Sequence, residues 1–245
     1  MATLFISDLH IDAGQPAVTG QFLSFLRGDA ANAESLYILG DLFESWIGDD
    51  DADSAQTAVI EGLNTLTAGG VPCFVMQGNR DFLLGPRFCA MSGAHLLPDP
   101  LVLTLYGESV LVMHGDALCT DDRAYQRLRA TVRDAGWQRE FLALSVSRRR
   151  ALAGAARSGS RAHTAAADQG ITDVNAASVA TALRTAGLSM LLHGHTHRPA
   201  VHRFEVDGRA CTRIVLGDWH AQGSVLRWDE EGQELLALPR SGTPE

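Results

Sequence analysis

The hydrophobic residues of this chain follow two patterns that alternate along the first eighty positions. Short apolar runs at 3–6, 35–39 and 73–76 contain no charged residue and predict strands that are buried on both faces. Between them, apolar residues recur every three or four positions at 18–26 and 55–66, which predicts helices. Strands that alternate with helices favour βαβ crossovers, so we expect an α/β fold with a largely parallel sheet.

The pattern changes after residue 100, where pairs of strands follow one another without an intervening helix. Gly107-Glu108 and Asp207-Gly208 are each flanked by two apolar stretches and predict hairpins, the second with a type I′ turn. The strands predicted for this half of the chain are 101–106, 109–113, 189–192, 201–206, 210–216, 223–228 and 234–238. The last two are expected at the edge of a sheet.

A long helical stretch interrupts this half of the chain. From Asp122 to about Leu188, apolar residues such as Leu128, Phe141 and Leu152 recur at helical spacing, and no strand pattern occurs. We therefore expect a single domain over residues 1–245, with an inserted helical cap at about 122–188.

Composition limits the classes of protein that fit. With 245 residues, 46% of them hydrophobic, the chain is long enough to bury one large core. No apolar run approaches the roughly 18 residues that span a bilayer, and the strand at 3–6 leaves no room for a signal peptide, so a cytoplasmic protein is expected. The four cysteines lie far apart and predict reduced thiols rather than a disulfide or zinc framework.

Charge is unevenly distributed along the chain. The net charge of −9 argues against general nucleic-acid binding, and all 20 basic residues are arginine. Ten of them lie between Asp122 and Arg161, a segment that carries +7 while the remainder of the chain carries −16. This segregation favours an anionic ligand or an anionic lipid surface, although a solvated helical face would give the same pattern.

Polar residues with metal-binding side chains follow five of the predicted strands. Asp8 and His10 are two residues apart, so on an extended backbone their side chains project to the same side. The complete set is Asp8, His10, Asp41, Asn79, His114, His195 and His197. A mixed oxygen and nitrogen set suits Mn²⁺, Fe²⁺ or Zn²⁺, and seven ligands exceed what one ion takes from a protein. We therefore expect two ions, about 3.5–4 Å apart, that activate a water for attack on a phosphorus ester.

Five short motifs carry a resemblance to a known family, although each histidine taken alone more often has a structural role. In chain order the motifs are Asp8-x-His10, Gly40-Asp41, Gly78-Asn79, His114 and Gly194-His195-x-His197. Together they resemble the calcineurin-like metallophosphoesterases. This resemblance implies a four-layer αββα sandwich of two mixed sheets. It also implies two ion sites that share Asp41, one completed by Asp8, His10 and His197 and the other by Asn79, His114 and His195.

One position narrows the resemblance to a branch of that superfamily. Most members continue Gly-Asn with a histidine that acts on the leaving group, whereas here Arg80 follows Asn79, and arginine is no general acid at neutral pH. The stretches 40–50, 78–83 and 193–199 are similar to the UDP-2,3-diacylglucosamine diphosphatases of lipid A biosynthesis. That similarity implies hydrolysis of the substrate's pyrophosphate to UMP and 2,3-diacylglucosamine 1-phosphate (lipid X). Water activated by two divalent ions, for which Mn²⁺ is expected, would attack the α-phosphorus.

The same resemblance assigns roles to individual residues. Arg80 and His195 would stabilise the negative charge that develops during the reaction. Residues implied to contact the substrate are Asn79, Arg80, Asp122, Ser160, Thr164 and His195. Relatives usually have a lysine where this chain has Ala167, and Arg161 is a candidate to replace that contact.

The cap implies a lipid substrate and a membrane surface as partners. Acyl chains need an apolar slot. Cap residues that could line it are Trp137, Phe141, Leu142, Leu144, Val146 and Leu152. The cap arginines would face anionic lipid, so we expect peripheral attachment to the cytoplasmic side of the inner membrane and no obligate protein partner.

Two other interpretations fit the same motifs. The site could cleave another nucleotide diphosphate or a cyclic nucleotide, or the fold could serve as a non-catalytic binding scaffold. An apolar, arginine-rich cap and Arg80 argue against the first, and seven intact ligands argue against the second. The segment 42–50 distinguishes this branch from the wider superfamily, but the sequence predicts no role for it.

Overall fold

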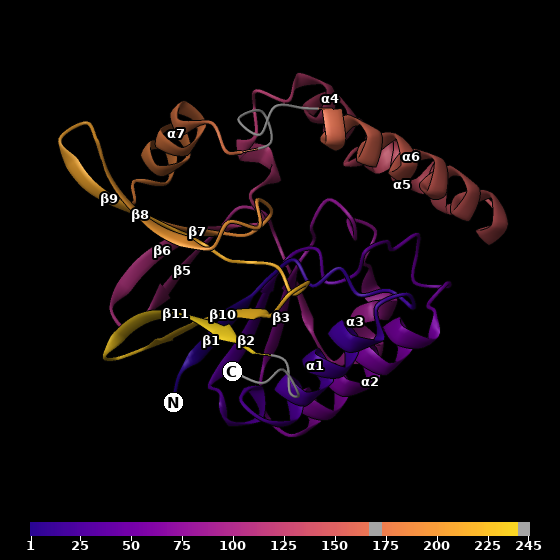
Figure 1. Ribbon diagram of the computed structural model, residues 1–245, viewed down its shortest axis with the longest axis horizontal. Coiled ribbons are helices and arrows are strands. Elements are labelled where there is room, and N and C mark those ends of the chain that lie inside the picture. The colour runs from indigo at the N-terminus through magenta and orange to yellow at the C-terminus, as the bar shows by residue number, and fades with distance from the viewer. Residues whose placement is uncertain (167–172, 240–245) are drawn as a thin grey trace.

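The computed structural model of the chain describes residues 1–166 and 173–239, with the backbone alone for 159–166. Two β-sheets lie face to face at its centre (Figure 1). In spatial order the first sheet contains β11 (Gly232–Leu238), β10 (Gly223–Asp229), β1 (Thr3–Ile6), β2 (Ser35–Leu39), β3 (Cys73–Met76) and β4 (His95–Leu97). The second contains β5 (Leu101–Leu105), β6 (Glu108–Met113), β7 (Met190–His193), β9 (Arg209–Val215) and β8 (Ala200–Val206).

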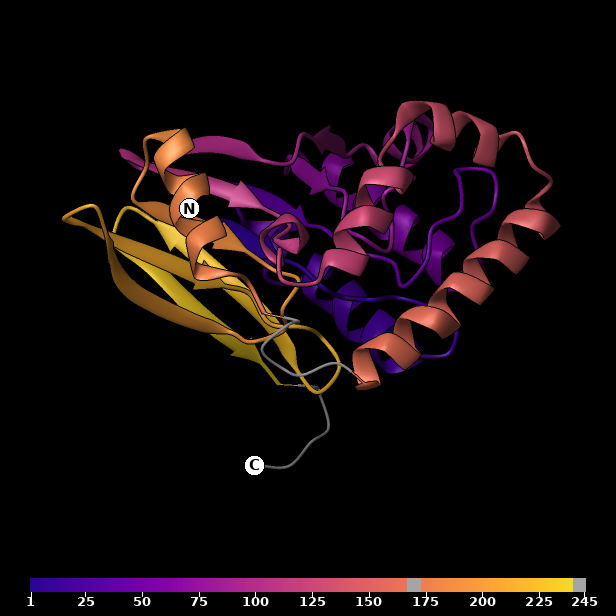
Figure 2. The ribbon, with the colours of Figure 1, turned by 90° about the horizontal axis from the view of Figure 1, so that it is seen from above.

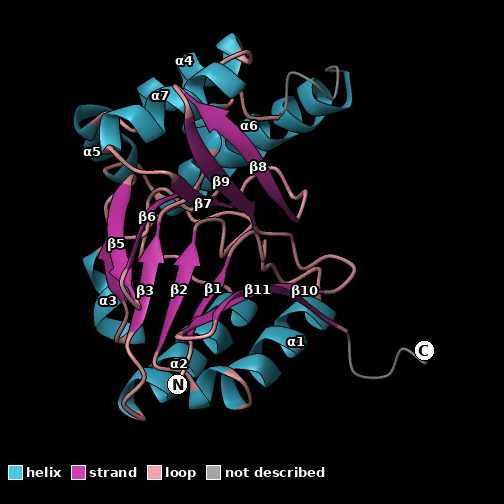
Figure 3. Ribbon diagram, turned by 90° about the vertical axis from the view of Figure 1, so that its left-hand side faces the viewer, coloured by secondary structure: helices cyan, strands magenta, loops and turns pink. Residues whose placement is uncertain are grey.

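Both sheets mix parallel and antiparallel neighbours. Strands β1 to β4 are parallel, and the arrowheads of β2 and β3 point the same way in Figure 3, whereas β10 and β11 pair antiparallel at one edge. In the second sheet β6, β7 and β9 are parallel, and the two predicted hairpins supply β5 and β8. Asp207 and Gly208 have φ angles of 52° and 77°, as a type I′ turn requires. The predicted pair of mixed sheets is therefore confirmed.

Alternation of side chains along the strands explains how the layers pack. Phe5 points between the sheets, where it joins Val112 and Leu192 of the second sheet in one apolar cluster. Its neighbours Leu4 and Ile6 point to the other face and pack among the helices. That helical layer consists of α1 (Pro16–Arg27), α2 (Ser54–Ala68) and α3 (Pro86–Ser92). A 3₁₀ turn, Ala30–Asn32, follows α1.

Helix α7 (Ala176–Ala186) covers the outer face of the second sheet, on the side of the molecule away from α1 to α3 (Figure 1). Its Val179 and Leu183 are buried in a cluster with Leu111 and Leu191 of the sheet. A sandwich of helices, two sheets and a further helix results, so the predicted four-layer αββα architecture is confirmed.

Three further helices project beyond the sandwich (Figure 2). A 3₁₀ turn, Asp116–Leu118, leads from β6 toward α4 (Arg123–Val132), α5 (Ala135–Leu142) and α6 (Val146–Ala166). We call α4, α5 and α6 the cap helices. Because α7 packs on the second sheet, it belongs to the sandwich, although it falls within the 122–188 stretch. In the described residues, no helix is both long and apolar enough to cross a membrane.

Candidate active site

The carboxyl ends of strands from both sheets meet at one place, and the predicted metal-binding residues lie there. Asp8 follows β1, Asp41 follows β2 and Asn79 follows β3. From the second sheet, His114 follows β6 directly and His195 comes two residues after β7. Parallel pairing within each sheet brings these strand ends side by side, which is why residues so distant in sequence converge.

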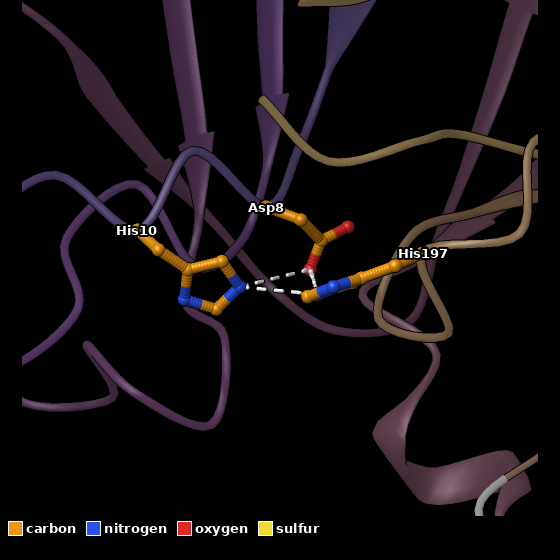
Figure 4. A group of neighbouring side chains, drawn as sticks. All are labelled: Asp8, His10 and His197. Carbon is orange, nitrogen blue, oxygen red and sulfur yellow. Dashed lines mark hydrogen bonds and ion pairs between the residues drawn. The ribbon is translucent and has the colours of Figure 1, made fainter. Parts of the chain in front are cut away.

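The first group consists of Asp8, His10 and His197 (Figure 4). His197 Nε2 lies 3.4 Å from Asp8 Oδ1 and 3.1 Å from His10 Nε2. His10 Nε2 is 4.0 Å from the same Asp8 oxygen. All three ligand atoms therefore face one point, and all three side chains are mostly buried.

The second group consists of Asp41, His114 and His195, whose ligand atoms lie within 4.8 Å of one another. His114 Nε2 is 3.8 Å from Asp41 Oδ1 and 2.9 Å from Asn79 Oδ1, so Asn79 joins this group. Asp41 Oδ2 faces the other way and lies 3.8 Å from His10 Nε2. Asp41 thus presents one carboxylate oxygen to each group, which is the geometry expected of a bridge.

Backbone conformation directs these side chains. Asp8, His10, Asp41, His195 and His197 all have positive φ angles, between 50° and 67°. Such left-handed conformations are uncommon for residues other than glycine, and they are typical of sites where a side chain is aimed at a ligand. The chain therefore accepts local strain at five of the seven predicted ligands.

The motif glycines leave room for this convergence. A Cβ atom at Gly78 would lie 2.1 Å from Asp41 Oδ1, and one at Gly194 would lie 2.3 Å from Ser7 Oγ. Two heavy atoms that are not bonded to each other cannot approach so closely, so any side chain at either position would displace Asp41 or Asp8.

Asp81 fastens two of the strand-end loops together. Its buried carboxylate accepts hydrogen bonds from the backbone N–H groups of Leu42 at 2.8 Å, Phe43 at 3.3 Å and Gly78 at 2.8 Å. Burial and the nearby charge of Asp41 raise the pKa of Asp81, whereas the hydrogen bonds from Gly78 and Phe43 favour its ionised form. The position of Asp41 relative to Asn79 depends on this carboxylate.

Replacing Asp81 with alanine should lower the free energy of unfolding by about 3 kcal/mol, because three buried N–H groups lose their acceptor. Removing the helix-capping carboxylate of Asp53, which accepts from Gln56 N, should cost only about 1 kcal/mol. Urea denaturation of both variants provides the measurement. Equal losses of stability would contradict the role given to Asp81.

The electrostatics of the site favour a bound cation. Burial lowers the pKa of His195 to about 4, which keeps the imidazole in the neutral form that binds metals. Burial opposes charge on His197 as well, but hydrogen bonds and the charges of Asp218 and Asp8 outweigh it and raise the pKa of His197 to about 10. The carboxylates of Asp8 and Asp218, which stabilise the positive charge of protonated His197, would also attract a divalent ion.

The donor set fits two metal ions. Asp8 Oδ1 is buried at the focus of the first group, where it faces His197 Nε2 at 3.4 Å and His10 Nε2 at 4.0 Å. A buried carboxylate oxygen needs positive charge or hydrogen-bond donors beside it, and a divalent cation at this point would supply the charge. Carboxylate, amide and imidazole donors together suit a first-row divalent metal.

The sequence did not predict two carboxylates that contact predicted metal-binding histidines. Glu44 Oε2 lies 2.9 Å from His10 Nδ1, and Asp218 Oδ2 lies 3.1 Å from His197 Nδ1, so each fixes the orientation of one imidazole. Asp218 follows the end of β9, and the strand-end rule used for the other residues would have found it. Burial raises the pKa of Glu44, but the His10 hydrogen bond and nearby arginine charges outweigh this effect and lower it to about 2.

Tyr125 and Asp116 border the second group. The ring of Tyr125 stacks on His195 with centroids 6.1 Å apart, and its hydroxyl donates to Asp116. Arg129 Nε donates to the same carboxylate at 2.8 Å. Burial opposes the charge of Asp116, but His114, Arg129 and His195 hold its pKa below the usual range. Helix α4 is thereby attached directly beside His195.

A pocket of about 560 Å³ opens beside the metal-binding groups, between the cap helices and the loops that follow β2 and β3. Asn79 and Arg80 line its polar end. Its apolar lining comes from Trp46, Ile47, Phe82, Leu83, Leu128, Val132, Trp137, Phe141, Leu144, Leu152, Ala153 and Ala156. Four of the six apolar cap residues predicted to form a slot line it; Leu142 and Val146 lie elsewhere.

The predicted substrate residues fall into three classes. Asn79 and Arg80 line the pocket, whereas His195 does not line it but stacks on Tyr125, which does. Asp122 caps α4, where its Oδ1 accepts from Tyr125 N at 2.9 Å. The side chains of Ser160, Arg161 and Thr164 lie outside the described residues, as does Ala167.

Five of the ten arginines in the basic segment make contacts that the sequence did not predict. They bind carboxylates or carbonyl oxygens of the sandwich and its loops, and they are Arg129, Arg133, Arg149, Arg150 and Arg157. The cap and the segment that follows β2 carry opposite charges, so these arginines dock the cap helices on the sandwich. Arg149 is almost completely buried in this role.

Comparison with known proteins agrees with this geometry. The calcineurin-like phosphoesterase family matches residues 1–199. A relative from Xanthomonas axonopodis pv. citri (strain 306), named UDP-2,3-diacylglucosamine hydrolase, is 51% identical over 245 residues, covering 97% of this chain and 99% of that protein. A relative of the same name from Stenotrophomonas maltophilia (strain R551-3) is 51% identical over 247 residues, covering 98% and 100%. This chain belongs to the calcineurin-like phosphoesterase family and, within it, to the family of these UDP-2,3-diacylglucosamine hydrolases.

Proposed function

We propose that this protein hydrolyses the pyrophosphate bond of UDP-2,3-diacylglucosamine and releases UMP and 2,3-diacylglucosamine 1-phosphate, a step of lipid A biosynthesis. The observation that carries the proposal is the pocket, because its apolar walls lead directly to Asn79 and Arg80 beside the metal-binding groups. A substrate with acyl chains at one end and phosphates at the other matches that arrangement. The names of relatives at about 50% identity support the same substrate.

Two divalent ions, for which we propose Mn²⁺, would be held by the two groups. Asp8, His10 and His197 would hold one, and Asn79, His114 and His195 the other, with Asp41 shared between them. When bound, the ions lower the pKa of a water and neutralise charge on the phosphoryl oxygens.

The residues of the chain would orient the substrate and stabilise charge. Arg80 and Asn79 are placed to pair with oxygens of the pyrophosphate, and the apolar cap residues hold the acyl chains away from water. The ring of His195 contacts those of His114 and Tyr125, and burial lowers its pKa. Because its imidazole is neutral, His195 can bind a divalent ion, and it carries no extra proton to donate to the leaving group. The leaving group is a sugar phosphate, which departs without a strong general acid.

Incubation of the purified protein with Mn²⁺ and UDP-2,3-diacylglucosamine should release UMP and the lipid phosphate in equal amounts. UDP-N-acetylglucosamine, which lacks the two long acyl chains, should be cleaved far more slowly because it leaves the apolar pocket empty. Faster cleavage of this soluble nucleotide, or of a cyclic nucleotide, would assign the site to another phosphodiesterase reaction.

We also propose that the cap helices attach the protein peripherally to the cytoplasmic face of the inner membrane. Four of the seven exposed large apolar side chains in the described residues lie on the cap helices or between them, namely Leu128, Leu142, Leu144 and Leu152. Exposed arginines accompany them, including Arg123, Arg127, Arg139 and Arg148. Exposed apolar and basic groups on the same three helices favour binding to anionic lipid.

Replacing Leu142 with aspartate should reduce binding to vesicles of anionic phospholipid by about tenfold. The change removes a leucine that would insert into the lipid and adds a negative charge that anionic lipid repels. Leu142 is 42% exposed and does not line the pocket, so turnover of a detergent-dispersed substrate should change little. Val102 on β5, which is 48% exposed, provides the matched control as Val102→Asp. Flotation of both variants measures binding, and equal losses would place the membrane contact outside the cap.

A further inference from the structure

The segment 42–50, which has no role in the proposed metal shell, joins the cap to the site. Asp49 accepts hydrogen bonds from Gly85 N, Arg87 N and Phe88 N, which holds the segment against the start of α3. Other contacts of the segment reach α6, where Arg149 donates to the carbonyl oxygen of Ile47. The segment therefore lies between the cap helices and the strand end that carries Asp41.

Glu44 is the member of this segment that touches both sides. One carboxylate oxygen, Oε2, lies 2.9 Å from His10 Nδ1, and the other, Oε1, forms an ion pair with Arg157 of α6. Arg157 also donates to the carbonyl oxygen of Glu44 at 3.1 Å. Both side chains are mostly buried, with 13% and 23% of their surfaces exposed, so solvent screens these contacts only in part.

The contact with Glu44 determines how His10 can act. A carboxylate at Nδ1 accepts the proton of that nitrogen, so in the neutral imidazole it favours the tautomer whose free Nε2 is directed at Asp8 and His197. Arg157 holds the second Glu44 oxygen and so fixes the plane of the carboxylate. The orientation and tautomer of His10 thus depend on the docking of α6.

We propose that Glu44 and Arg157 form a relay that couples docking of the cap helix α6 to metal affinity at the Asp8, His10 and His197 group. Coupling between two sites is reciprocal, so an ion at this group would in turn stabilise the docked cap beside the pocket. Glu44 and Arg157 are positioning residues in this scheme. The proposal rests on the metal-binding function proposed above and adds the dependence of one ion on the cap.

The chain supplies a matched control for this relay. Arg150, near the start of α6, pairs with Asp51, so it joins the same helix to the same part of the chain. None of the contacts described for Arg150 or Asp51 reaches a predicted metal ligand. Loss of the Arg150 pair therefore tests cap docking alone, whereas loss of the Arg157 pair tests the relay.

The experiment measures Mn²⁺ binding to the full chain, through the electron paramagnetic resonance signal of free Mn²⁺. Wild-type protein should bind two ions. Glu44→Gln should weaken one of them by about 10- to 100-fold, the usual effect of losing a carboxylate behind a metal-binding histidine. Arg157→Met should weaken the same ion several-fold, Arg150→Met should leave both unchanged, and Arg157→Met should have no further effect in the Glu44→Gln background.

Each other outcome has a distinct meaning. Absence of bound Mn²⁺ in the wild type would overturn the metal centre itself. Two ions in the wild type, with equal effects of Arg157→Met and Arg150→Met or with no effect of Arg157→Met, would overturn the relay alone. Additive effects of the Glu44 and Arg157 substitutions would also overturn it. If Glu44→Gln fails to fold, the comparison of the two arginine variants still decides.

Discussion

Replacing Asp41 with asparagine should lower kcat by about 1000-fold. The two carboxylate oxygens of Asp41 face different metal-binding groups, at 3.8 Å from His114 Nε2 and 3.8 Å from His10 Nε2. An amide offers one neutral oxygen and one nitrogen donor, so it cannot serve both ions. Loss of about 4 kcal/mol of charge stabilisation from the paired ions corresponds to this factor.

Asparagine tests the charge without disturbing the fold. Asp41 has a φ angle of 52°, and asparagine is one of the few residues that adopt this conformation readily. The amide oxygen can still accept from Arg80 N, which donates to Asp41 Oδ1 at 2.8 Å. Asp51, whose carboxylate accepts from Arg150 of the cap, provides the matched control, and Asp51→Asn should retain turnover within a few-fold. Near-normal turnover by Asp41→Asn would exclude a bridging role for this residue.

Replacing Arg80 with alanine should lower kcat by about 100- to 1000-fold with a smaller change in KM. Arg80 lines the polar end of the pocket, and its Nε is buried without a hydrogen-bond partner among the described residues. A preorganised cation with an unsatisfied donor can stabilise the charge that develops on the phosphoryl oxygens, and such groups typically contribute this factor.

Chemical rescue distinguishes this role from a structural one. Added guanidinium should restore part of the activity of Arg80→Ala, because the ion can occupy the space left by the side chain. Arg203→Ala, at an exposed position of β8, should behave as the wild type. If Arg80→Ala raised KM and left kcat unchanged, Arg80 would contribute to binding of the ground state only.

Local sequence patterns predicted all but one of the described strands and placed polar residues at their ends, whereas the four layers were implied by the family resemblance. Buried runs such as Tyr37–Leu39 contain no charge, so they fit only a sheet covered on both faces, and a polar residue after each run lies where parallel strands end. The Asp207-Gly208 pair specifies its turn by itself. Strand β4 and helix α3 were missed because three and seven residues are too few to show a period.

Contacts that depend on tertiary structure could not be predicted from the sequence. Asp81 holds three backbone N–H groups from two loops, and no spacing reveals which carboxylate does so. The basic segment was correctly singled out, but sequence alone cannot distinguish an arginine that faces lipid from one that docks a helix. Arg149 and Arg157 became interpretable only when Asp50 and Glu44 were seen beside them.

Hydrolysis of UDP-2,3-diacylglucosamine in H₂¹⁸O tests the central claim most directly. Attack of activated water on the α-phosphorus places the new oxygen on the nucleotide, and the lipid keeps the phosphate oxygens that it had. Mass spectrometry should therefore find one ¹⁸O atom in UMP and none in 2,3-diacylglucosamine 1-phosphate. Label in the lipid phosphate, or no release of UMP with Mn²⁺ bound, would contradict the proposed reaction.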